Sequence, residues 1–280
     1  MAITLKCNAK VNLSLDIVGK RDDGYHNIEL IFDEVGLYDI LTVALRDDGI
    51  VRLECDDKTL PTDDKNIAYR AALEFIKKSG VSFGAEIKLK KNIPHGAGLG
   101  GGSSDAAGVL NAMNELTGFP LNDDELKDVG AKLGADVPFF INGGCAFAEG
   151  IGEILTPLKK PENFVYVIAK PEESISTAYV YKNIDLKNRP NDFSVRLVAE
   201  GLNRGDYDTV FKHCGNIMES VTEKECPIIK DIKECMLTNG AKMSLMSGSG
   251  TAVFGVFDNK NAAETAAKSV FKFTDKVYLA

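Results

Sequence analysis

Residues 3–17 alternate between apolar and polar side chains without a break, and few backbone structures can satisfy such a pattern. In ITLKCNAKVNLSLDI, every second position from Ile3 to Ile17 is apolar or small, and the positions between them are polar. Successive side chains of a β-strand point to opposite faces, so a period of two over this length predicts a half-buried strand. Lys10 and Asn12 then point to the same, polar side of that strand.

The same reasoning predicts a mixture of strands and helices along the rest of the N-terminal half. Short strands with short connections favour antiparallel pairing. The helix IAYRAALEFIKKSG opens after Asn66 and ends at Gly80, and a later helix opens at Asn122 with Glu125 three residues on, the spacing of a capping box. The predicted strands cover 28–33, 40–45, 50–55 and 85–93, and the predicted helices cover 67–80, 103–117 and 122–133.

The stretch TPLKKPEN, with Pro157 and Pro161, is the best candidate for a domain boundary. Beyond it the pattern predicts a strand in FVYVIAK, a mostly helical stretch over 192–239, two strands hinged at glycines in KMSLMSGSGTAVFGVF, a helix and a last strand. A split β-α-β sheet satisfies that order. We therefore predict an α+β fold in two domains, residues 1–157 and 158–280.

The net charge of −8 argues against binding to nucleic acid, whose phosphates are held by clustered lysine and arginine side chains. A small anionic ligand needs only a few local cations and is compatible with this charge. The N-terminal residues lack the apolar core of a signal peptide, and no apolar run is long enough to span a membrane. The six cysteines show no metal-ligand spacing, so we expect reduced thiols in a cytoplasmic protein.

A glycine-rich segment, PHGAGLGGGSSDAAG at residues 94–108, suggests a binding site for phosphate. Its Gly96-x-Gly98-x-x-Gly101 spacing formally matches the dinucleotide fingerprint, but a second helix is predicted where a Rossmann unit returns to a parallel strand. The P-loop pattern fails because serine rather than lysine follows Gly102. Neither motif therefore accounts for the segment, although its chemistry still suits an anion.

Glycine backbones can approach an anion closely, and a helix that starts at Ser103 offers unpaired N–H groups and the positive end of its dipole. Ser103 or Ser104 is expected to cap this helix, and either hydroxyl can reach a phosphate oxygen or Mg²⁺. The alternative is a glycine-rich turn and a capped helix without a ligand. Five glycines in seven positions provide more backbone freedom than capping requires, which favours the ligand.

Phosphoryl transfer to an alcohol also needs a cation and a group that positions the hydroxyl. Lys10 is the candidate cation because it stands on a regular strand, and the alternative is an ordinary solvated lysine. Asp136, in GADVPFF, is the candidate base if it is partly desolvated, and the alternative is a turn aspartate. Tyr25 and His26, in DGYH, form a loop that can stack on a planar base or can be polar surface.

Three segments, taken together, resemble the motifs of one family, the GHMP small-molecule kinases. AKVNLSLDIVGKRDDGYHNIE resembles their N-terminal motif, PHGAGLGGGSSDAAG their central nucleotide-binding motif, and MSGSGTAVFGVF their third motif. Within that superfamily, DGYH and LGADVPFF match the branch that acts on an alcohol linked to cytidine diphosphate. The resemblance spans almost the whole chain and keeps the family's order of motifs.

The resemblance implies a two-domain fold with the active site in the cleft between the domains. It also implies ATP-dependent phosphorylation of the 2-hydroxyl of diphosphocytidyl-methylerythritol in non-mevalonate isoprenoid biosynthesis, with Mg²⁺ bound together with ATP. Asp136 falls on the family's catalytic aspartate, which orients or deprotonates the alcohol. Lys10 falls on its catalytic lysine, which tunes that carboxylate and neutralises charge on the transferring phosphoryl group.

The resemblance also assigns binding residues. His26 falls where the family reads cytosine, Tyr25 and Tyr181 fall on the two faces of the base, and Ser104 is a candidate ligand of Mg²⁺. The predicted substrate-binding residues are Asn12, Tyr25, His26, Thr177, Tyr181 and Gly248. The predicted ATP-binding residues are Asn66, Lys91, Pro94, Gly96, Ala97, Gly98, Leu99, Gly100, Gly101, Gly102, Ser103 and Ser104.

Three other functions are open at this point: a related kinase for a smaller alcohol such as homoserine or mevalonate, a nucleotide-binding module without catalysis, and a dehydrogenase. The aromatic residues Tyr25 and Tyr181 disfavour the first, because a small alcohol needs no stacking rings. The presence of both Lys10 and Asp136 disfavours the second. We expect a monomer or weak homodimer without nucleic-acid or membrane partners.

Overall fold

The computed structural model describes residues 1–186 and 193–280, and the chain divides into two compact units. Each unit is assembled from separate segments of the chain. The first unit contains residues 1–9, 38–93 and 100–143, and the second contains residues 10–37, 94–99 and 144–280. The predicted boundary after residue 157 falls inside the second unit.

In the first unit, strand β4 (Gly84–Lys90) lies between β3 (Val51–Cys55) and the second half of β2 (His26–Arg46). The pairing of β2 with β4 is antiparallel, and that of β3 with β4 is parallel. Because β4 lies between them, the strands predicted at 40–45 and 50–55 do not form the antiparallel pair that their short connection suggests. Parallel neighbours need a crossover, and helix α1 (Ile67–Ser79) provides it. The strands predicted at 28–33 and 40–45 are two parts of the one long strand β2.

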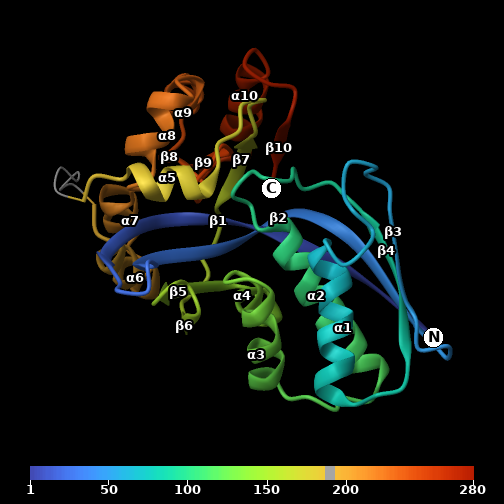
Figure 1. Cartoon of the computed structure of the whole chain (residues 1–280). Coiled ribbons are helices and arrows are strands. Elements are labelled where there is room, and N and C mark those ends of the chain that lie inside the picture. The colour runs from blue at the N-terminus through green and yellow to red at the C-terminus, as the bar shows by residue number, and fades with distance from the viewer. Residues whose placement is uncertain (187–192) are drawn as a thin grey trace. The chain divides into compact units, whose positions relative to one another are not determined.

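Four helices of the first unit pack on one another (Figure 1). Two of them begin at the residues that the sequence predicts. The Asn66 side chain accepts a hydrogen bond from the N–H of Ala68 at the start of α1, and Asn122 forms a capping box with Glu125. The other helices are α2 (Gly101–Leu116), α3 (Asp123–Leu133) and α4 (Val137–Asn142).

Helix α2 starts two residues earlier than predicted. Its N-cap residue is Gly100, which has a left-handed backbone (φ 71°) and makes no side-chain capping bond. The N–H of Ser104 already donates to the Gly100 carbonyl, so Ser103 and Ser104 belong to the first helical turn. The prediction that one of these serines caps the helix is therefore wrong. Gly100 occupies the N-cap position, and its left-handed backbone forms the turn into the helix.

The second unit contains a four-stranded antiparallel sheet. Helices α9 (Ile228–Thr238) and α10 (Lys260–Val270) pack against each other and against this sheet (Figure 1). The strand order confirms the split β-α-β arrangement that the order of elements predicts. Across the sheet the strands are β10 (Val277–Leu279), β7 (Val165–Ala169), β9 (Val253–Phe257) and β8 (Met243–Met246).

The first half of β2 pairs with β5 (Cys145–Glu149), and β5 pairs with β6 (Ile154–Pro157), all within the second unit. Residue 192, where the helical stretch was predicted to begin, lies outside the described residues. The helices that connect β7 to β8 are α5 (Thr177–Asn183), α6 (Val195–Arg204), α7 (Tyr207–His213), α8 (Glu219–Glu225) and α9.

Strand β1 (Ala2–Lys20) pairs with β2, and it is more deeply buried than its pattern predicts. From Ala9 to Ile17 both faces are covered, including the polar one. Only 4% of Lys10 and 1% of Asn12 is exposed, so the alternative of a solvated lysine is wrong. The polar face is buried because segments distant in the sequence pack on it, which local alternation cannot reveal.

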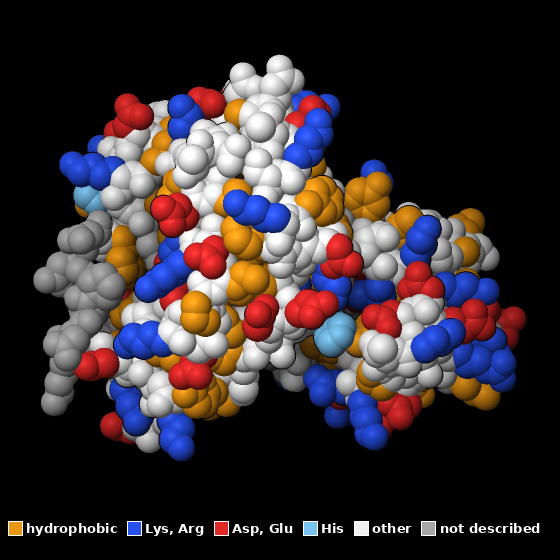
Figure 2. All heavy atoms as spheres, turned by 90° about the horizontal axis from the view of Figure 1, so that it is seen from above, with side chains coloured by type: hydrophobic (Ala, Val, Ile, Leu, Met, Phe, Trp, Pro, Cys, Tyr) orange, Lys and Arg blue, Asp and Glu red, His pale blue; other side chains and the backbone are white. Residues whose placement is uncertain are grey.

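All six cysteines are free thiols, as expected, and five of them are buried. Among the described residues, no helix combines the length and the apolar character needed to cross a membrane. On the face shown in Figure 2, acidic and basic side chains are interspersed. The charges on that face are therefore mixed in sign.

The capping box predicts a measurable loss of stability in the variant Asn122→Ala. Removing the cap should lower the free energy of unfolding by about 1 kcal/mol, because the N–H of Glu125 loses its partner. Urea unfolding of the full chain, followed by circular dichroism, measures this change. Asp128→Ala, an exposed site on the same helix, should change stability by less than about 0.5 kcal/mol, and equal losses in both variants would contradict the assignment.

Candidate active site

The glycine-rich segment is shared between the units: residues 94–99 belong to the second unit, and the residues from Gly100 on belong to the first. Within the second unit, Gly98 has φ 78°, and a Cβ built there would lie 2.1 Å from the carbonyl oxygen of Ser247. Glycine is thus required both by backbone conformation and by the close approach of the loop between β8 and β9. The N–H of Lys10 donates to the carbonyl of Leu99 at 2.9 Å, which fixes the end of this part of the segment.

In the first unit, the start of α2 has the properties of an anion site. The first N–H groups of a helix have no intrahelical acceptor, and the helix dipole is positive at this end. Gly101 and Gly102 occupy the first two positions, where side chains would otherwise shield those groups. Ser103 is half-buried and Ser104 is buried.

Asp136 lies at the N-cap position of the short helix α4 and is half-buried, as expected of a partly desolvated carboxylate. The preceding turn is closed by a hydrogen bond from the N–H of Val137 to the carbonyl of Gly134 (3.1 Å). A Cβ built on Gly134 would lie 3.9 Å from Ser103 Oγ. Within the first unit, the turn that carries Asp136 therefore adjoins the start of α2.

Lys91 is held by two carboxylates. Its Nζ forms ion pairs with Asp39 and, at 2.5 Å, with Asp105, and only 8% of its side chain is exposed. Burial lowers the pKa of Lys91, but Asp105 and Asp39 outweigh this effect and raise it overall, so the ammonium stays charged. Burial raises the pKa of Asp105 to about 7 in spite of Lys91.

This ion-pair cluster connects Lys91, directly after β4, to Asp105, the fifth residue of α2. Asp39 Oδ1 also accepts the backbone N–H groups of Asn92 (2.5 Å) and Ile93 (2.9 Å). The predicted contact between Lys91 and phosphate would have to be made by an ammonium that already serves two carboxylates. In this structure Lys91 and its partner Asp39 fix the residues at 91–93, which directly precede the glycine-rich segment.

Asn66, predicted to contact adenine, orders its own loop. Its Oδ1 caps α1, and its Nδ2 donates to the carbonyl of Pro61 at 2.8 Å. A pocket of about 650 Å³ adjoins this loop in the first unit. Its lining includes Leu53, Cys55, Asp57, Lys58, Leu60 and Thr62.

Lys10 and Asn12 are neighbours on the buried polar face of β1. Lys10 Nζ donates to Asn12 Oδ1 at 2.7 Å and lies 5.2 Å from the ring centroid of Phe32. A lysine ammonium can only donate, so the contact orients the amide with its oxygen toward Lys10. Asn12 Nδ2 is buried and finds no hydrogen-bond partner among the described residues. Because an unsatisfied buried donor costs about 1–3 kcal/mol, this amide is a candidate donor to a ligand.

The hydroxyl of Ser247 joins this strand to the glycine-rich segment. It accepts the backbone N–H of Asn12 at 3.3 Å and donates to the carbonyl of Gly98 at 2.9 Å. A Cβ built on Gly248 would lie 3.4 Å from Asn12 Oδ1. The loop between β8 and β9 therefore packs against two segments that both belong to the predicted site.

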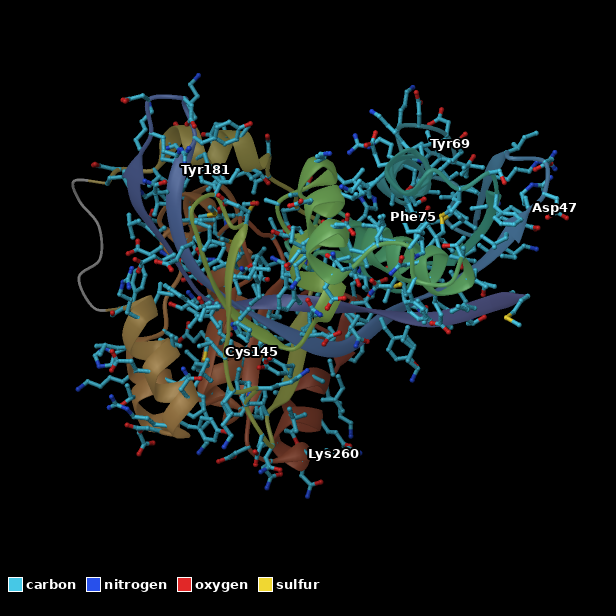
Figure 3. All side chains as sticks on the ribbon, turned by 90° about the horizontal axis from the view of Figure 1, so that it is seen from below. Asp47, Tyr69, Phe75, Cys145, Tyr181 and Lys260 are labelled. Carbon is cyan, nitrogen blue, oxygen red and sulfur yellow. The ribbon has the colours of Figure 1, made fainter. Side chains whose placement is uncertain are left out.

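Helix α5 brings two more predicted residues to the same place. Thr177 and Tyr181 are four residues apart and share one side of the helix. The hydroxyl of Thr177 lies 2.7 Å from that of Ser249, and the ring of Tyr181 stacks on His26 with 5.3 Å between centroids and 25° between planes. Figure 3 shows Tyr181 beside the end of the β1–β2 hairpin.

The predicted partner of Tyr181 across a base was Tyr25. In this structure Tyr25 is 62% exposed, and the ring that stacks on Tyr181 is that of His26. Sequence analysis did not single out Ser247 or Asp39, both of which hold predicted residues in place. The serine-glycine run around 247 was the one signal available, since small residues allow close approach.

Among residues 1–186 and 193–280, no group of three or more His, Cys, Asp or Glu side chains is arranged to hold a metal ion. Ser104 therefore stands without neighbouring carboxylate ligands of that kind. A magnesium ion that arrives with a nucleotide takes most of its ligands from phosphate oxygens and water. The residues at the start of α2 fit such an ion only as a complex with phosphate.

Two family descriptions match the chain. "GHMP kinases N terminal domain" matches residues 66–144, and "GHMP kinases C terminal" matches residues 198–275. Together they cover more than half of the sequence. They lie on either side of the predicted boundary at 157.

Individual relatives match over nearly the full length. A 4-diphosphocytidyl-2-C-methyl-D-erythritol kinase of Alkaliphilus metalliredigens is 44% identical over 268 residues, which are 96% of this chain and 92% of the relative. A protein of the same name from Geobacter sp. (strain M21) is 45% identical over 271 residues, with 96% and 95% covered.

Solved structures give the same picture. A crystal structure of 4-(cytidine 5'-diphospho)-2C-methyl-D-erythritol kinase superposes with a TM-score of 0.84 at 34% identity, covering 99% of this chain and 98% of that one. Homoserine kinase from Cytophaga hutchinsonii, at 22% identity and a TM-score of 0.77 over 100% of this chain and 94% of its own, shares the fold. The chain therefore belongs to the GHMP kinases and, within them, to the family of the 4-diphosphocytidyl-2-C-methyl-D-erythritol kinases.

Proposed function

We propose that this protein transfers the terminal phosphoryl group of ATP to the 2-hydroxyl of 4-diphosphocytidyl-2-C-methyl-D-erythritol, a step of non-mevalonate isoprenoid biosynthesis. The observation that carries the proposal is the similarity, at 41–45% identity along nearly the whole chain, to relatives that bear this enzyme's name. Its location in the cytoplasm and its monomeric or weakly dimeric state stay predictions.

The glycine-rich segment and the start of α2 supply the proposed ATP site. Residues Pro94 to Ser104 include Gly96, where a Cβ would meet nothing within 4 Å, and the first helical turn, whose N–H groups have no intrahelical acceptor. Magnesium bound together with ATP would supply positive charge that offsets the charge of the phosphates. Ser104 is its proposed protein ligand, and Asn66 and Lys91 are proposed to shape the site through the loops that they hold.

Asp136 and Lys10 are the proposed catalytic residues. Asp136 is half-buried at the start of α4 and would orient the acceptor hydroxyl or take its proton. Lys10 is a buried cation on a regular strand, and it would stabilise the negative charge of the phosphoryl group during its transfer. A loose transition state demands little deprotonation, so positioning and charge carry most of the rate.

The second unit gathers the proposed acceptor-binding residues. Asn12 offers a buried N–H that lacks a partner among the described residues. Thr177 and Gly248 are linked through Ser249, and the rings of His26 and Tyr181 form an aromatic pair suited to a planar base. Tyr25 is exposed on the same hairpin, and its ring is proposed to stack on the solvent-facing side of such a base.

The direct test is phosphoryl transfer from ATP, measured as ADP release and confirmed by mass spectrometry of the product. The acceptors are the cytidine diphosphate-linked alcohol, methylerythritol phosphate without the cytidine, homoserine and mevalonate. The proposal expects turnover with the first acceptor only. Equal turnover with a small alcohol would overturn the assignment of the acceptor, and no transfer to any alcohol would overturn the activity.

Replacing Asp136 by asparagine should abolish most of the turnover. Asparagine has nearly the same shape but loses the negative charge that orients the hydroxyl and cannot accept its proton, so we expect kcat to fall about 10²–10⁴-fold. The dissociation constant for ATP, measured by calorimetry, should change little. Asp128→Asn, an exposed site on the neighbouring helix α3, serves as the control and should keep its kcat. Near-normal turnover in Asp136→Asn would exclude the catalytic role.

Replacing Tyr181 by alanine should weaken binding of the acceptor. Stacking on an aromatic ring contributes about 1–3 kcal/mol per base, so KM for the acceptor should rise about 5- to 150-fold while KM for ATP stays nearly constant. Tyr181→Phe keeps the ring and should stay close to the unmodified protein.

Tyr179→Ala is the matched control for Tyr181→Ala. Tyr179 lies on the same helix, is 42% exposed and donates its hydroxyl to Glu225 at 3.0 Å. If both alanine variants raise KM for the acceptor equally, the effect comes from damage to α5, and the stacking role of Tyr181 is wrong.

A further inference from the structure

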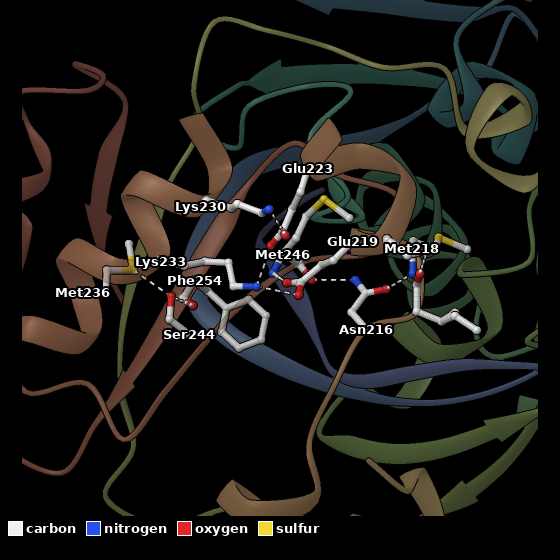
Figure 4. A network of polar contacts seen from close by, with 12 residues as sticks. Asn216, Met218, Glu219, Glu223, Lys230, Lys233, Met236, Ser244, Met246 and Phe254 are labelled. Atoms are coloured by element: carbon white, nitrogen blue, oxygen red, sulfur yellow. Dashed lines mark hydrogen bonds and ion pairs between the residues drawn. The ribbon is translucent and has the colours of Figure 1, made fainter. Parts of the chain in front are cut away.

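Asn216 holds the loop between β8 and β9 from beneath. Its Nδ2 donates to two carbonyl oxygens of that segment, those of Met246 (2.7 Å) and Gly248 (2.8 Å), as Figure 4 shows for Met246. Its Oδ1 accepts the N–H of Met218 at 2.9 Å, just before α8. The side chain is 5% exposed, and both of its polar atoms are used.

A pair of charges supports the same loop at its start. Glu219 accepts the N–H of Met246 at 2.6 Å and forms an ion pair with Lys233 at 2.5 Å (Figure 4). Lys233, on α9, also pairs with Glu223 at 2.7 Å. Burial raises the pKa of Glu219 and Lys233 opposes that rise, so the carboxylate depends on its lysine partner. Helices α8 and α9 therefore anchor the end of β8.

The opposite side of the loop faces the proposed site. Ser247 Oγ bridges the N–H of Asn12 and the carbonyl of Gly98, as described above. One residue further, Gly248 adjoins Asn12 Oδ1, and Ser249 meets the hydroxyl of Thr177. One side of the loop is therefore held by α8 and α9, and its other side contacts residues that are proposed to bind the acceptor and phosphate.

We infer that Asn216 is a positioning residue for phosphoryl transfer: by clamping the carbonyls of Met246 and Gly248, it sets where the Ser247 hydroxyl stands and so holds Asn12 in register with Gly98. The inference rests on the proposed function and extends it to a residue that touches no ligand. Misplacing reacting groups by about 1 Å can cost on the order of 10²-fold in rate. A clamp of this kind therefore acts on turnover even though it lies behind the site.

The variant Asn216→Asp removes the clamp with the least change of shape. Aspartate replaces the donating NH₂ by an oxygen, which faces two carbonyl oxygens and repels them unless it is protonated. Asn114→Asp is the matched control. Asn114 is also buried (4% exposed), and it also clamps backbone, since its Nδ2 donates to the carbonyl of Leu121 and its Oδ1 accepts the N–H of the same residue. It lies in the first unit near the C-terminal end of α2.

The first measurement is hydrogen exchange of the backbone amides in residues 246–252, followed by mass spectrometry on the full chain without any substrate. Asn216→Asp should speed exchange in this segment at least tenfold, while Asn114→Asp leaves it unchanged. This readout needs no acceptor, so it tests the clamp even if the proposed reaction is wrong. Unchanged exchange in Asn216→Asp would overturn the clamp.

The second measurement is steady-state kinetics with the acceptor that the phosphoryl-transfer assay identifies. Asn216→Asp should lower kcat about 10- to 100-fold, because the reacting groups that the clamp positions through Ser247 are displaced. A lower melting temperature with kcat unchanged would mean that Asn216 only stabilises the fold, and the inference would fail.

A double variant tests whether the effect passes through Ser247. Ser247→Ala removes the bridging hydroxyl but leaves the two hydrogen bonds from Asn216 in place. It therefore tests the same path even if Asn216→Asp does not fold. If the path is the one inferred, the double variant loses no more kcat than Asn216→Asp alone. Losses that simply multiply would show independent effects and would contradict a route through Ser247.

Discussion

The burial of the polar face of β1 is the constraint on which the rest of the second unit depends. Lys10, Asn12 and Ser14 alternate with core residues, yet the structure covers them almost completely. A buried polar group without a partner costs free energy, so Ser14 and the backbone N–H of Asn12 take partners from elsewhere in the chain, whereas Lys10 takes a partner from its own strand. Ser14 Oγ pairs with the backbone of Gly215, Asn12 with Ser247, and Lys10 with Asn12 itself.

That requirement explains why two loops of small residues meet. Gly98 and Ser247 approach so closely that any side chain at 98 would collide with backbone, and the Ser247 hydroxyl donates to the Gly98 carbonyl. The amide oxygen of Asn12 then accepts from Lys10, while its Nδ2 has no hydrogen-bond partner in the described part of the chain. The unpaired amide N–H is the feature that makes this packed strand a proposed binding site.

The first unit contains a cluster of three charged side chains near the start of α2. It places Lys91 between Asp39 and Asp105 beneath the start of α2, and so joins the end of β4 to the helix whose N–H groups are proposed to bind phosphate. Buried charges are tolerated where they are paired, and both carboxylates of this cluster pair with Lys91, while Asp105 Oδ1 finds no hydrogen-bond partner among the described residues. In the proposed phosphate site, the attraction then comes mainly from the helix end and its backbone N–H groups.

The sequence by itself determined the elements whose signals are local. Strand β1, helix α1 with Asn66 and Gly80 at its ends, and the capping box of Asn122 all follow from periodicity and capping chemistry, and the three motifs identified the family. The tertiary structure decided the parallel pairing of β3 with β4, the start of α2 at Gly101, and the burial of Lys10. It also decided which side chains hold the loop at Ser247. These features depend on contacts between residues far apart in the chain, and such contacts leave no periodic trace in the sequence.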